Sequence, residues 1–170
     1  MIFLSLGSNL SSKLGNRFDN LDFSLLLLEN YGISIIKKSN FYETPSYPNN
    51  KNPKFINLIV GVKTNLPPID LLSVLLFVEE KIERKRDIKN QPRTCDIDII
   101  DYNGKIYDLN YKNFNLLIPH KEMNSRNFVL FPLKEIEPNW KHPKTKESID
   151  TLIENLSLED RKSILKVKKS

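Results

Sequence analysis

The sequence predicts an α+β fold in which helices pack on an antiparallel β-sheet. Segments with strand composition and segments with helical periodicity follow one another in the order β-α-β-β-α-β. This order gives the split βαβ, or ferredoxin-like, sheet with both helices on one face. The length of 170 residues, without an internal repeat or interdomain linker, favours a single domain over residues 1–170.

The first half of the pattern begins with an apolar run, Ile2 to Leu6, which predicts a buried strand. A helix should follow from about Lys13 or Asn16 to Asn30, because apolar residues recur there at helical spacing. Ile33 to Tyr42 predicts a second strand. Thr44 to Pro53 is polar and rich in proline, and therefore predicts a long loop.

The second half predicts a strand from Phe55 to Thr64 and a helix from about Ile69 to Arg84. Lys85 to Pro92 is polar without apolar periodicity, and we expect a second mobile loop there. Thr94 to Tyr102 predicts the last strand of the pattern. The dipeptide Asn103-Gly104 after it is a strong hairpin turn signal.

The remainder of the chain is less regular. Past Pro119 we expect short helical or irregular pieces, followed by a terminal helix from Ile149 to Leu156. Residues 157–170 are expected to form a C-terminal tail whose last residues, from Lys166 on, fray.

Composition narrows the class of protein. No apolar run approaches the length of a membrane span, and the start of the chain lacks the basic residues of a signal peptide. The single cysteine, Cys95, excludes an internal disulfide and favours a reducing compartment, so we expect a cytoplasmic protein without a membrane partner. The formal net charge of +5 suits nucleic acid or phosphorylated ligands and does not distinguish between them.

Arginine is rare in this chain and unevenly placed. Lysine cannot replace the planar guanidinium where a phosphate must be gripped through two hydrogen bonds. Four of the six arginines lie within a short stretch, at Arg84, Arg86, Arg93 and Arg126. The cluster predicts a phosphate site, with chance clustering as the alternative.

The segment Pro92 to Ile100 carries the strongest local signal. In a strand, Asp96 and Asp98 point to one face and stand about 7 Å apart, while Cys95 points to the opposite, core face. Two carboxylates so close repel one another unless water screens them or a cation lies between them, and oxygen ligands suit Mg²⁺. The alternative to a metal site is a strand with one solvent-exposed face, but aspartate is depleted in strands. With Arg93 next to the pair, the metal interpretation is favoured.

Three further positions have both a functional and an ordinary interpretation. His120 lies six residues before Arg126 and could donate to a phosphate, although a lone histidine is more often a surface or core residue. Phe55 and Asn57 share a strand face, where a ring can stack on a flat heterocycle and a carboxamide can read its edge. A core phenylalanine and an edge asparagine are the alternative. Phe128 is likewise most often a core residue.

Taken together, six segments in this order and spacing resemble the 6-hydroxymethyl-7,8-dihydropterin pyrophosphokinase family of the folate pathway. The resemblance covers about residues 1 to 155. The segments are Leu6 to Leu10, Phe41 to Pro45, Phe55 to Asn57, Glu79 with Arg84 and Arg86, Pro92 to Asp98, and Ile118 to Leu133.

The resemblance implies transfer of a diphosphate from ATP to the hydroxymethyl group of the pterin, with release of AMP. It implies two Mg²⁺ ions on Asp96 and Asp98, and loops that act as lids. It places on ATP the residues Glu79, Arg84, Arg86, Arg93, His120 and Arg126. The catalytic residues among them are Arg84, Arg93, His120 and Arg126. It places around the pterin the residues Thr44, Pro45, Tyr47, Phe55, Asn57 and Phe128, with the ring stacked between Phe55 and Phe128. Asn115 and Leu117 fall where some members contact the nucleotide.

Two other functions were weighed. A nucleic-acid-binding ferredoxin-like module fits the fold and charge, but paired carboxylates repel a phosphate backbone and the aromatic-rich strand pattern of RNA-binding modules is absent. A degenerate, non-catalytic relative is disfavoured by the presence of Asp96, Asp98, Arg93 and His120. We therefore expect a monomer whose partners are ATP and the pterin, with no nucleic acid.

Overall fold

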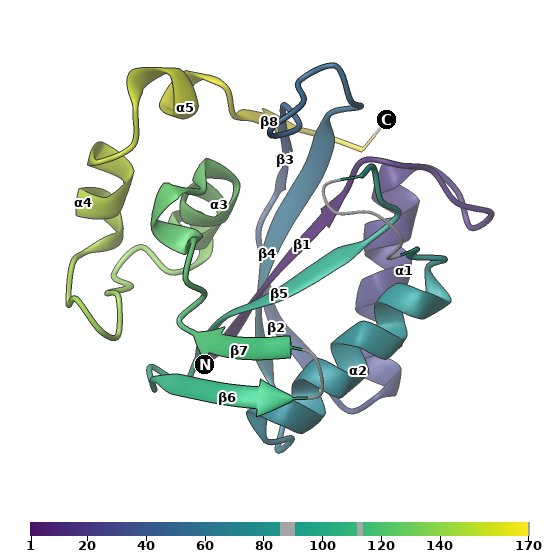
Figure 1. Ribbon diagram of the computed structural model, residues 1–170, viewed down its shortest axis with the longest axis horizontal. Coiled ribbons are helices and arrows are strands. Elements are labelled where there is room, and N and C mark those ends of the chain that lie inside the picture. Colours follow the sequence, from purple (N-terminus) through teal and green to yellow (C-terminus); the bar gives the residue numbers. More distant parts are fainter. Residues whose placement is uncertain (86–90, 112–113, 170) are drawn as a thin grey trace.

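The computed structural model describes residues 1–85, 91–111 and 114–169, and its main element is a twisted antiparallel sheet (Figure 1). The strands run in the order β5-β1-β4-β3-β8, and β2 also pairs with β4. Their bounds are β1 (Ile2–Ser8), β2 (Ser34–Lys38), β3 (Phe41–Thr44), β4 (Phe55–Lys63), β5 (Asp96–Tyr102) and β8 (Leu165–Val167). Because β1 lies between β4 and β5 and is antiparallel to both, the predicted split βαβ order is confirmed.

Helices cover both faces of this sheet, as Figure 1 shows. On one face, α1 (Arg17–Asn30) and α2 (Pro68–Lys81) pack as the sequence predicts. On the opposite face lie the 3₁₀ turn η1 (Met123–Ser125), α3 (Asn127–Ile136) and α4 (Ile149–Glu154). The sequence predicts a helix at Ile149 to Leu156, which α4 confirms, and short helical pieces after Pro119, but it does not indicate that these segments cover the second face of the sheet. A short helix, α5 (Leu158–Lys162), follows it.

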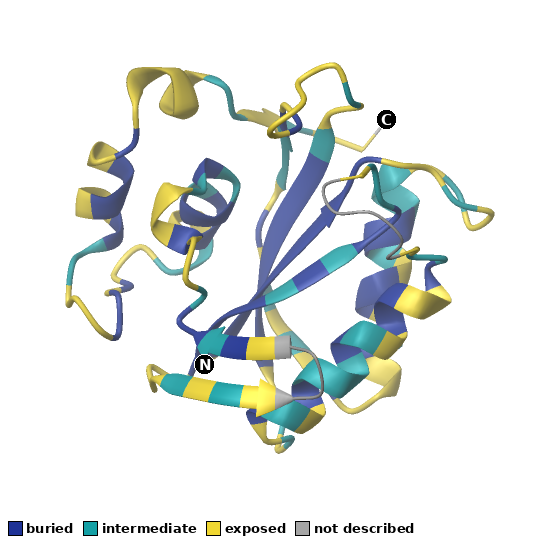
Figure 2. Cartoon of the chain, viewed as in Figure 1, coloured by how far each residue is buried: buried dark blue, intermediate teal, exposed yellow. Residues whose placement is uncertain are grey.

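Each face of the sheet has its own apolar core, so the central strands β1 and β4 are almost entirely buried, whereas β2 alternates between exposed and half-buried residues (Figure 2). Leu4 and Leu6 of β1 face α1 and α2, whereas Phe3 faces the α3 and α4 side. The alternation follows the two-residue period of a strand. Both faces of β1 are therefore filled, and its seven residues are all buried.

Local signals explain where the first helix begins. The Asn16 side chain accepts hydrogen bonds from the backbone N–H groups of Phe18 and Asp19, and Asp19 accepts one in return from the Asn16 N–H. This capping box satisfies amides that a helix leaves without partners. Of the two predicted starts, Asn16 is the correct one.

Three details differ from the sequence prediction in whole or in part. The segment Ile33 to Tyr42 is two strands, β2 and β3, because Ser39 interrupts the ladder by accepting the Ile59 N–H through its hydroxyl. The Asn103-Gly104 turn is present, with both φ angles positive, but only one pair of residues, Tyr102 and Lys105, forms a β-bridge across it. The chain then enters a separate two-stranded sheet, β6 (Tyr107–Tyr111) and β7 (Phe114–Ile118).

The third difference is at the C-terminus. Residues Leu165–Val167 form β8, an edge strand paired with β3, whereas the sequence suggested a frayed end. The pairing is not encoded in local composition, because three residues give no periodicity. The long loop after Thr44 is found as predicted, while most of the loop predicted at 85–92 lies outside the described residues.

Candidate active site

The two aspartates of β5 lie on one face of the sheet, as the strand period predicts. Asp96 and Asp98 are partly exposed, whereas Cys95, Ile97 and Ile99 are buried in the core beneath α1 and α2. Burial also raises the pKa of the Cys95 thiol, which is consistent with packing rather than reactivity. The carboxylates thus form a polar face beside the core.

Asp96 is paired with two arginines that precede β5 in the sequence. Arg84 Nη1 lies 3.3 Å from Oδ1, and Arg93 Nη2 lies 2.9 Å from Oδ2. Arg84 also donates to the carbonyl oxygen of Cys95 at 2.8 Å, which fixes its guanidinium against the strand. Asn9 holds the Arg93 backbone by accepting its N–H at 2.7 Å.

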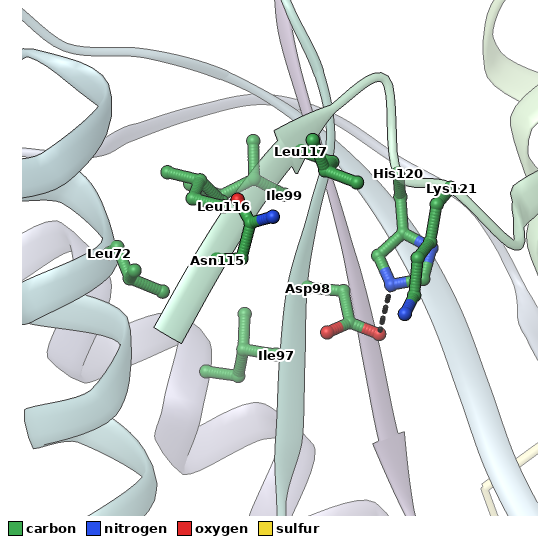
Figure 3. A pocket seen from close by; sticks show the side chains of 9 residues that line it. All are labelled: Leu72, Ile97, Asp98, Ile99, Asn115, Leu116, Leu117, His120 and Lys121. Carbon is green, nitrogen blue, oxygen red and sulfur yellow. Dashed lines mark ion pairs between the residues drawn. The ribbon is translucent and has the colours of Figure 1, made fainter. Parts of the chain in front are cut away.

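Asp98 is paired with the two basic residues that follow β7. Arg126 Nη1 lies 3.1 Å from Oδ2, and His120 Nε2 lies 3.8 Å from the same oxygen (Figure 3). Arg126 also pairs with Glu122, so its guanidinium bridges two carboxylates. Such a fork holds a planar geometry that an ammonium group cannot reproduce.

The environment changes the proton affinity of this pair. Burial, followed by the charge of Asp96, raises the pKa of Asp98 above its ordinary value. Burial lowers the pKa of His120, although the charge of Asp98 opposes this. His120 Nδ1 accepts the backbone N–H of Glu122 at 3.2 Å, so in the neutral ring the proton is on Nε2, which faces Asp98.

A second group of predicted residues lies across β1 from the carboxylates. Gly7 pairs in register with Asp96 on one side and with Asn57 on the other. Asn57 is buried and donates to Thr44 Oγ1 at 3.0 Å. A Cβ atom at Gly7 would come within 3.0 Å of Asn57 Oδ1, so glycine leaves room for this carboxamide.

Two aromatic rings of the site are each covered by an arginine. The Arg93 guanidinium carbon lies 5.0 Å from the centre of the Phe55 ring. That of Arg126 lies 5.6 Å from the centre of the Phe128 ring. Both distances are in the range of a cation–π contact. The same arginines therefore connect the carboxylates with the aromatic residues.

A pocket opens beside Asp98, between α2, β5 and β7 (Figure 3). Its floor is apolar, and Asp98, His120 and Lys121 stand at one end of it. The lining residues are Leu72, Ile97, Asp98, Ile99, Asn115, Leu116, Leu117, His120 and Lys121. The sequence does not single out Leu72, Ile97 or Ile99 as pocket residues, because pocket lining and core packing use the same apolar residues. The apolar–polar alternation from Tyr107 to Leu109 and around Asn115 could have revealed the small sheet.

Some predicted site residues lie apart from this group. Tyr47 is 91% exposed on its loop, and Pro45 is also exposed. Glu79 is buried and accepts the Ile97 N–H at 2.7 Å along the outer edge of β5. Arg86 lies outside the described residues. Their assigned roles stay predictions.

The donor set of the site limits which metal fits. Among residues 1–85, 91–111 and 114–169, no group of three or more histidine, cysteine or acidic residues could enclose an ion. Asp96 and Asp98 offer only carboxylate oxygens. Two carboxylates fit Mg²⁺, which commonly takes one or two from the protein and the rest from phosphate and water. Within the described part of the chain, none of the helices has the length and apolar character that a membrane span requires.

The sequence and the fold are similar to those of known proteins. The family model for 7,8-dihydro-6-hydroxymethylpterin-pyrophosphokinase matches residues 3–138. A Synechocystis protein named 2-amino-4-hydroxy-6-hydroxymethyldihydropteridine pyrophosphokinase is 36% identical over 148 residues, which cover 86% of this chain and 73% of that protein. The folic acid synthesis protein fol1 of Pneumocystis carinii is 34% identical over 164 residues, 96% of this chain but 21% of that protein.

The chain therefore spans about a fifth of the length of fol1 and of the Dictyostelium discoideum relative. Among solved structures, wild-type HPPK-DHPS of Plasmodium falciparum superposes with a TM-score of 0.71. The identity is 19%, with 89% of this chain and 43% of that chain covered, so this likeness shows the fold alone. From the extent of the family match and the Synechocystis relative, the chain belongs to the 7,8-dihydro-6-hydroxymethylpterin-pyrophosphokinase family.

Proposed function

We propose that this protein transfers a diphosphate from ATP to the hydroxymethyl group of 6-hydroxymethyl-7,8-dihydropterin, giving AMP and the pterin diphosphate in folate biosynthesis. One observation carries the proposal. Asp96 and Asp98 lie side by side on β5, each paired with cationic side chains, between an apolar pocket and a buried carboxamide. Membership of the family supports the same reaction.

The pocket beside Asp98 is the proposed site for the nucleoside of ATP. Apolar residues such as Leu72 and Ile99 can cover the faces of a base, and Asn115 can bind a polar group at its edge. His120 stands at the end of the pocket nearest the carboxylates, where its Nε2 proton can donate to a phosphate oxygen. The triphosphate would then run from His120 toward Asp96.

The arginines are proposed to bind the phosphates. In the structure Arg84 and Arg93 neutralise Asp96, and Arg126 neutralises Asp98. A cation that binds the carboxylates would take over this neutralisation, leaving the guanidinium groups available for the phosphate oxygens. Asp96 and Asp98 would hold Mg²⁺, which when bound offsets the negative charge of the triphosphate.

The pterin is proposed to bind across β1, against Asn57, Thr44, Phe55 and Phe128. A flat ring between Phe55 and Phe128 would displace or share the arginine contacts seen at both rings. Asn57 would read the pterin edge, since Thr44 fixes the orientation of its amide. The hydroxyl oxygen of the pterin would then attack the β-phosphorus of ATP, aligned by the residues that hold both substrates. The bond from that phosphorus to the oxygen bridging it to the α-phosphate would break, AMP would leave, and the hydroxyl proton would be released.

Product analysis with each substrate omitted in turn tests the proposal. ATP, Mg²⁺ and hydroxymethyldihydropterin together should give AMP, and omission of the pterin should give no nucleotide product. Formation of ADP, or of AMP at the same rate without the pterin, would overturn the proposed reaction. An EDTA-treated sample to which Mg²⁺ is returned tests the metal requirement separately.

Removal of the Asn57 amide should weaken pterin binding. Asn57→Ala should weaken the free energy of pterin binding by about 1–3 kcal/mol, because polar atoms of the ligand edge lose their buried partner. Binding of a non-hydrolysable ATP analogue should hardly change. Calorimetric titration of each ligand, the pterin in the presence of the analogue, measures both effects.

Asn115→Ala is the matched control, because it removes the same amide from the pocket on the other side of the carboxylates. It should weaken binding of the ATP analogue and spare the pterin. If Asn57→Ala weakens both ligands equally, or neither, the pterin site has been assigned to the wrong residues.

We also propose that the protein acts as a cytoplasmic monomer without nucleic-acid partners. The lone cysteine is buried and unavailable for a disulfide between copies. The paired carboxylates disfavour a phosphate backbone in the absence of metal. Light scattering of the purified protein, with and without substrates, tests the oligomeric state.

A further inference from the structure

We propose that the C-terminal strap, residues 157–167, positions the pterin pocket, and that Asn127 is the residue through which it acts. The strap comprises α5 and β8 together with the turns around them. It lies beyond residue 138, where the match to the family ends. Figure 1 shows it passing from the α3 and α4 layer to the β3 edge of the sheet. The inference rests on the proposed function of the pocket.

The first end of the strap is tied to the start of α3. Asn127, the first residue of that helix, is buried, and its Nδ2 donates to the carbonyl oxygen of Asp160 at 2.6 Å and to Ser163 Oγ at 3.0 Å. Ser163 in turn donates to the same carbonyl oxygen at 3.0 Å. One side-chain amide is thus held by two acceptors that both belong to the strap.

The hydrogen bonds from Asn127 to the strap are important because the N-terminus of α3 has no side-chain cap. Its N-cap residue is Arg126, whose side chain makes no capping hydrogen bond. Helix starts without such a cap are less stable, because their first backbone N–H groups lack partners. Asn127 supplies a tertiary anchor at the same turn. Its two neighbours, Arg126 and Phe128, are residues proposed to bind phosphate and pterin.

The second end of the strap is tied to the opposite wall of the pocket. Lys166 of β8 pairs in register with Tyr42, and Tyr42 pairs with Asn57 on its other side. The Tyr42 carbonyl oxygen is also within 3.5 Å of Asn57 Nδ2. β8 therefore backs the strand from which Thr44 holds the Asn57 amide.

A third group of contacts joins the two walls between these ends. Glu135 of α3 accepts the Asn40 N–H at 3.0 Å and pairs with Lys166 Nζ at 3.4 Å. It also accepts the Tyr42 hydroxyl, and burial together with this hydrogen bond raises the pKa of Tyr42. Glu135 thus bridges α3, β3 and β8. The strap consequently fixes the spacing between Phe128 and Asn57, which a flat ring must match.

Steady-state kinetics of Asn127→Ala test the proposal. The KM for the pterin should rise about tenfold, whereas kcat and the KM for ATP should stay within about twofold. The reason is that the lost hydrogen bonds disturb the geometry of the pterin pocket and not that of the ATP site. Ser163→Ala removes one acceptor and should raise the pterin KM less. The double variant should be no worse than Asn127→Ala alone, since both changes break the same contact.

Ser148→Ala is the control for a merely structural effect. Ser148 caps α4 by accepting the Thr151 N–H, and its side chain also bonds the Thr151 hydroxyl, within the same helix. It should lower thermal stability without changing either KM. If Asn127→Ala raises both KM values equally or changes neither, or if the effects of Asn127→Ala and Ser163→Ala add, the strap does not position the pterin. Should Asn127→Ala fail to fold, the pterin KM of Ser163→Ala decides, and an unchanged value overturns the proposal.

Amide hydrogen exchange of the ligand-free protein separates this proposal from the proposed reaction. Asn127→Ala should speed exchange at residues 128–130, and Ser148→Ala should leave those amides unchanged. A parent protein that forms no AMP would overturn the reaction while the exchange data still report on the strap. Unchanged exchange in Asn127→Ala would overturn the strap whatever the parent catalyses.

Discussion

Asp96→Asn and Asp98→Asn should each reduce turnover by more than about 10²-fold, because the charge that would hold Mg²⁺ is lost while the shape is kept. Stability should be spared. The raised pKa of Asp98 means that its ionised form is disfavoured by folding. The stability linked to this group is present at low pH and is lost as pH rises through the folded pKa. At neutral pH, Asp98→Asn should therefore be as stable as the parent or more stable. Initial rates and thermal unfolding of the same samples measure both effects.

Asp101→Asn is the matched control in the same strand. Asp101 is buried and accepts both the Trp140 Nε1–H and the Gly104 N–H at 2.8 Å. The side-chain amide of an asparagine would point its own N–H donors at one of these two N–H groups, which would lose its acceptor. Stability should therefore fall, while turnover stays near that of the parent. An Asp96→Asn or Asp98→Asn variant that keeps activity within a few-fold of the parent would refute the metal assignment.

Replacement of the site arginines by lysine should also slow the reaction strongly. Arg93→Lys and Arg126→Lys should each lower kcat by about 10²-fold, since a point charge cannot contact two oxygens in the plane of the guanidinium. In the structure, the two terminal nitrogens of the Arg126 guanidinium contact two different carboxylates, Nη1 that of Asp98 and Nη2 that of Glu122. Rates at saturating ATP and pterin measure the loss.

Arg161→Lys makes the same chemical change on α5, where the side chain is exposed. It should be near neutral. Equal losses in Arg93→Lys, Arg126→Lys and Arg161→Lys would mean that the arginine cluster carries no functional information.

The features that sequence predicted correctly depend on short-range periodicity. Side chains along a strand return to the same face every two residues. Asp96 and Asp98 therefore share one face of β5, and Phe55 and Asn57 share one face of β4. The β-α-β-β-α-β order was likewise sufficient to fix which strands adjoin β1. These relations need no knowledge of distant contacts.

The features that sequence missed depend on contacts between distant segments. The ties from Asn127 to Asp160 and Ser163 span more than thirty residues, and nothing in the local pattern announces them. The same holds for β8, whose three residues become a strand only because β3 offers an open edge. The resemblance places Tyr47 with the pterin residues, and this role stays a prediction for a side chain that is exposed on its loop.

Phosphorus-31 NMR of one reaction mixture tests the central claim most directly, because it identifies which phosphorus atoms move. With ATP, Mg²⁺ and hydroxymethyldihydropterin, the ATP signals should give way to AMP and to a diphosphate ester on the pterin in equal amounts. The appearance of ADP, or of free phosphate or diphosphate in place of the ester, would contradict diphosphate transfer by this site.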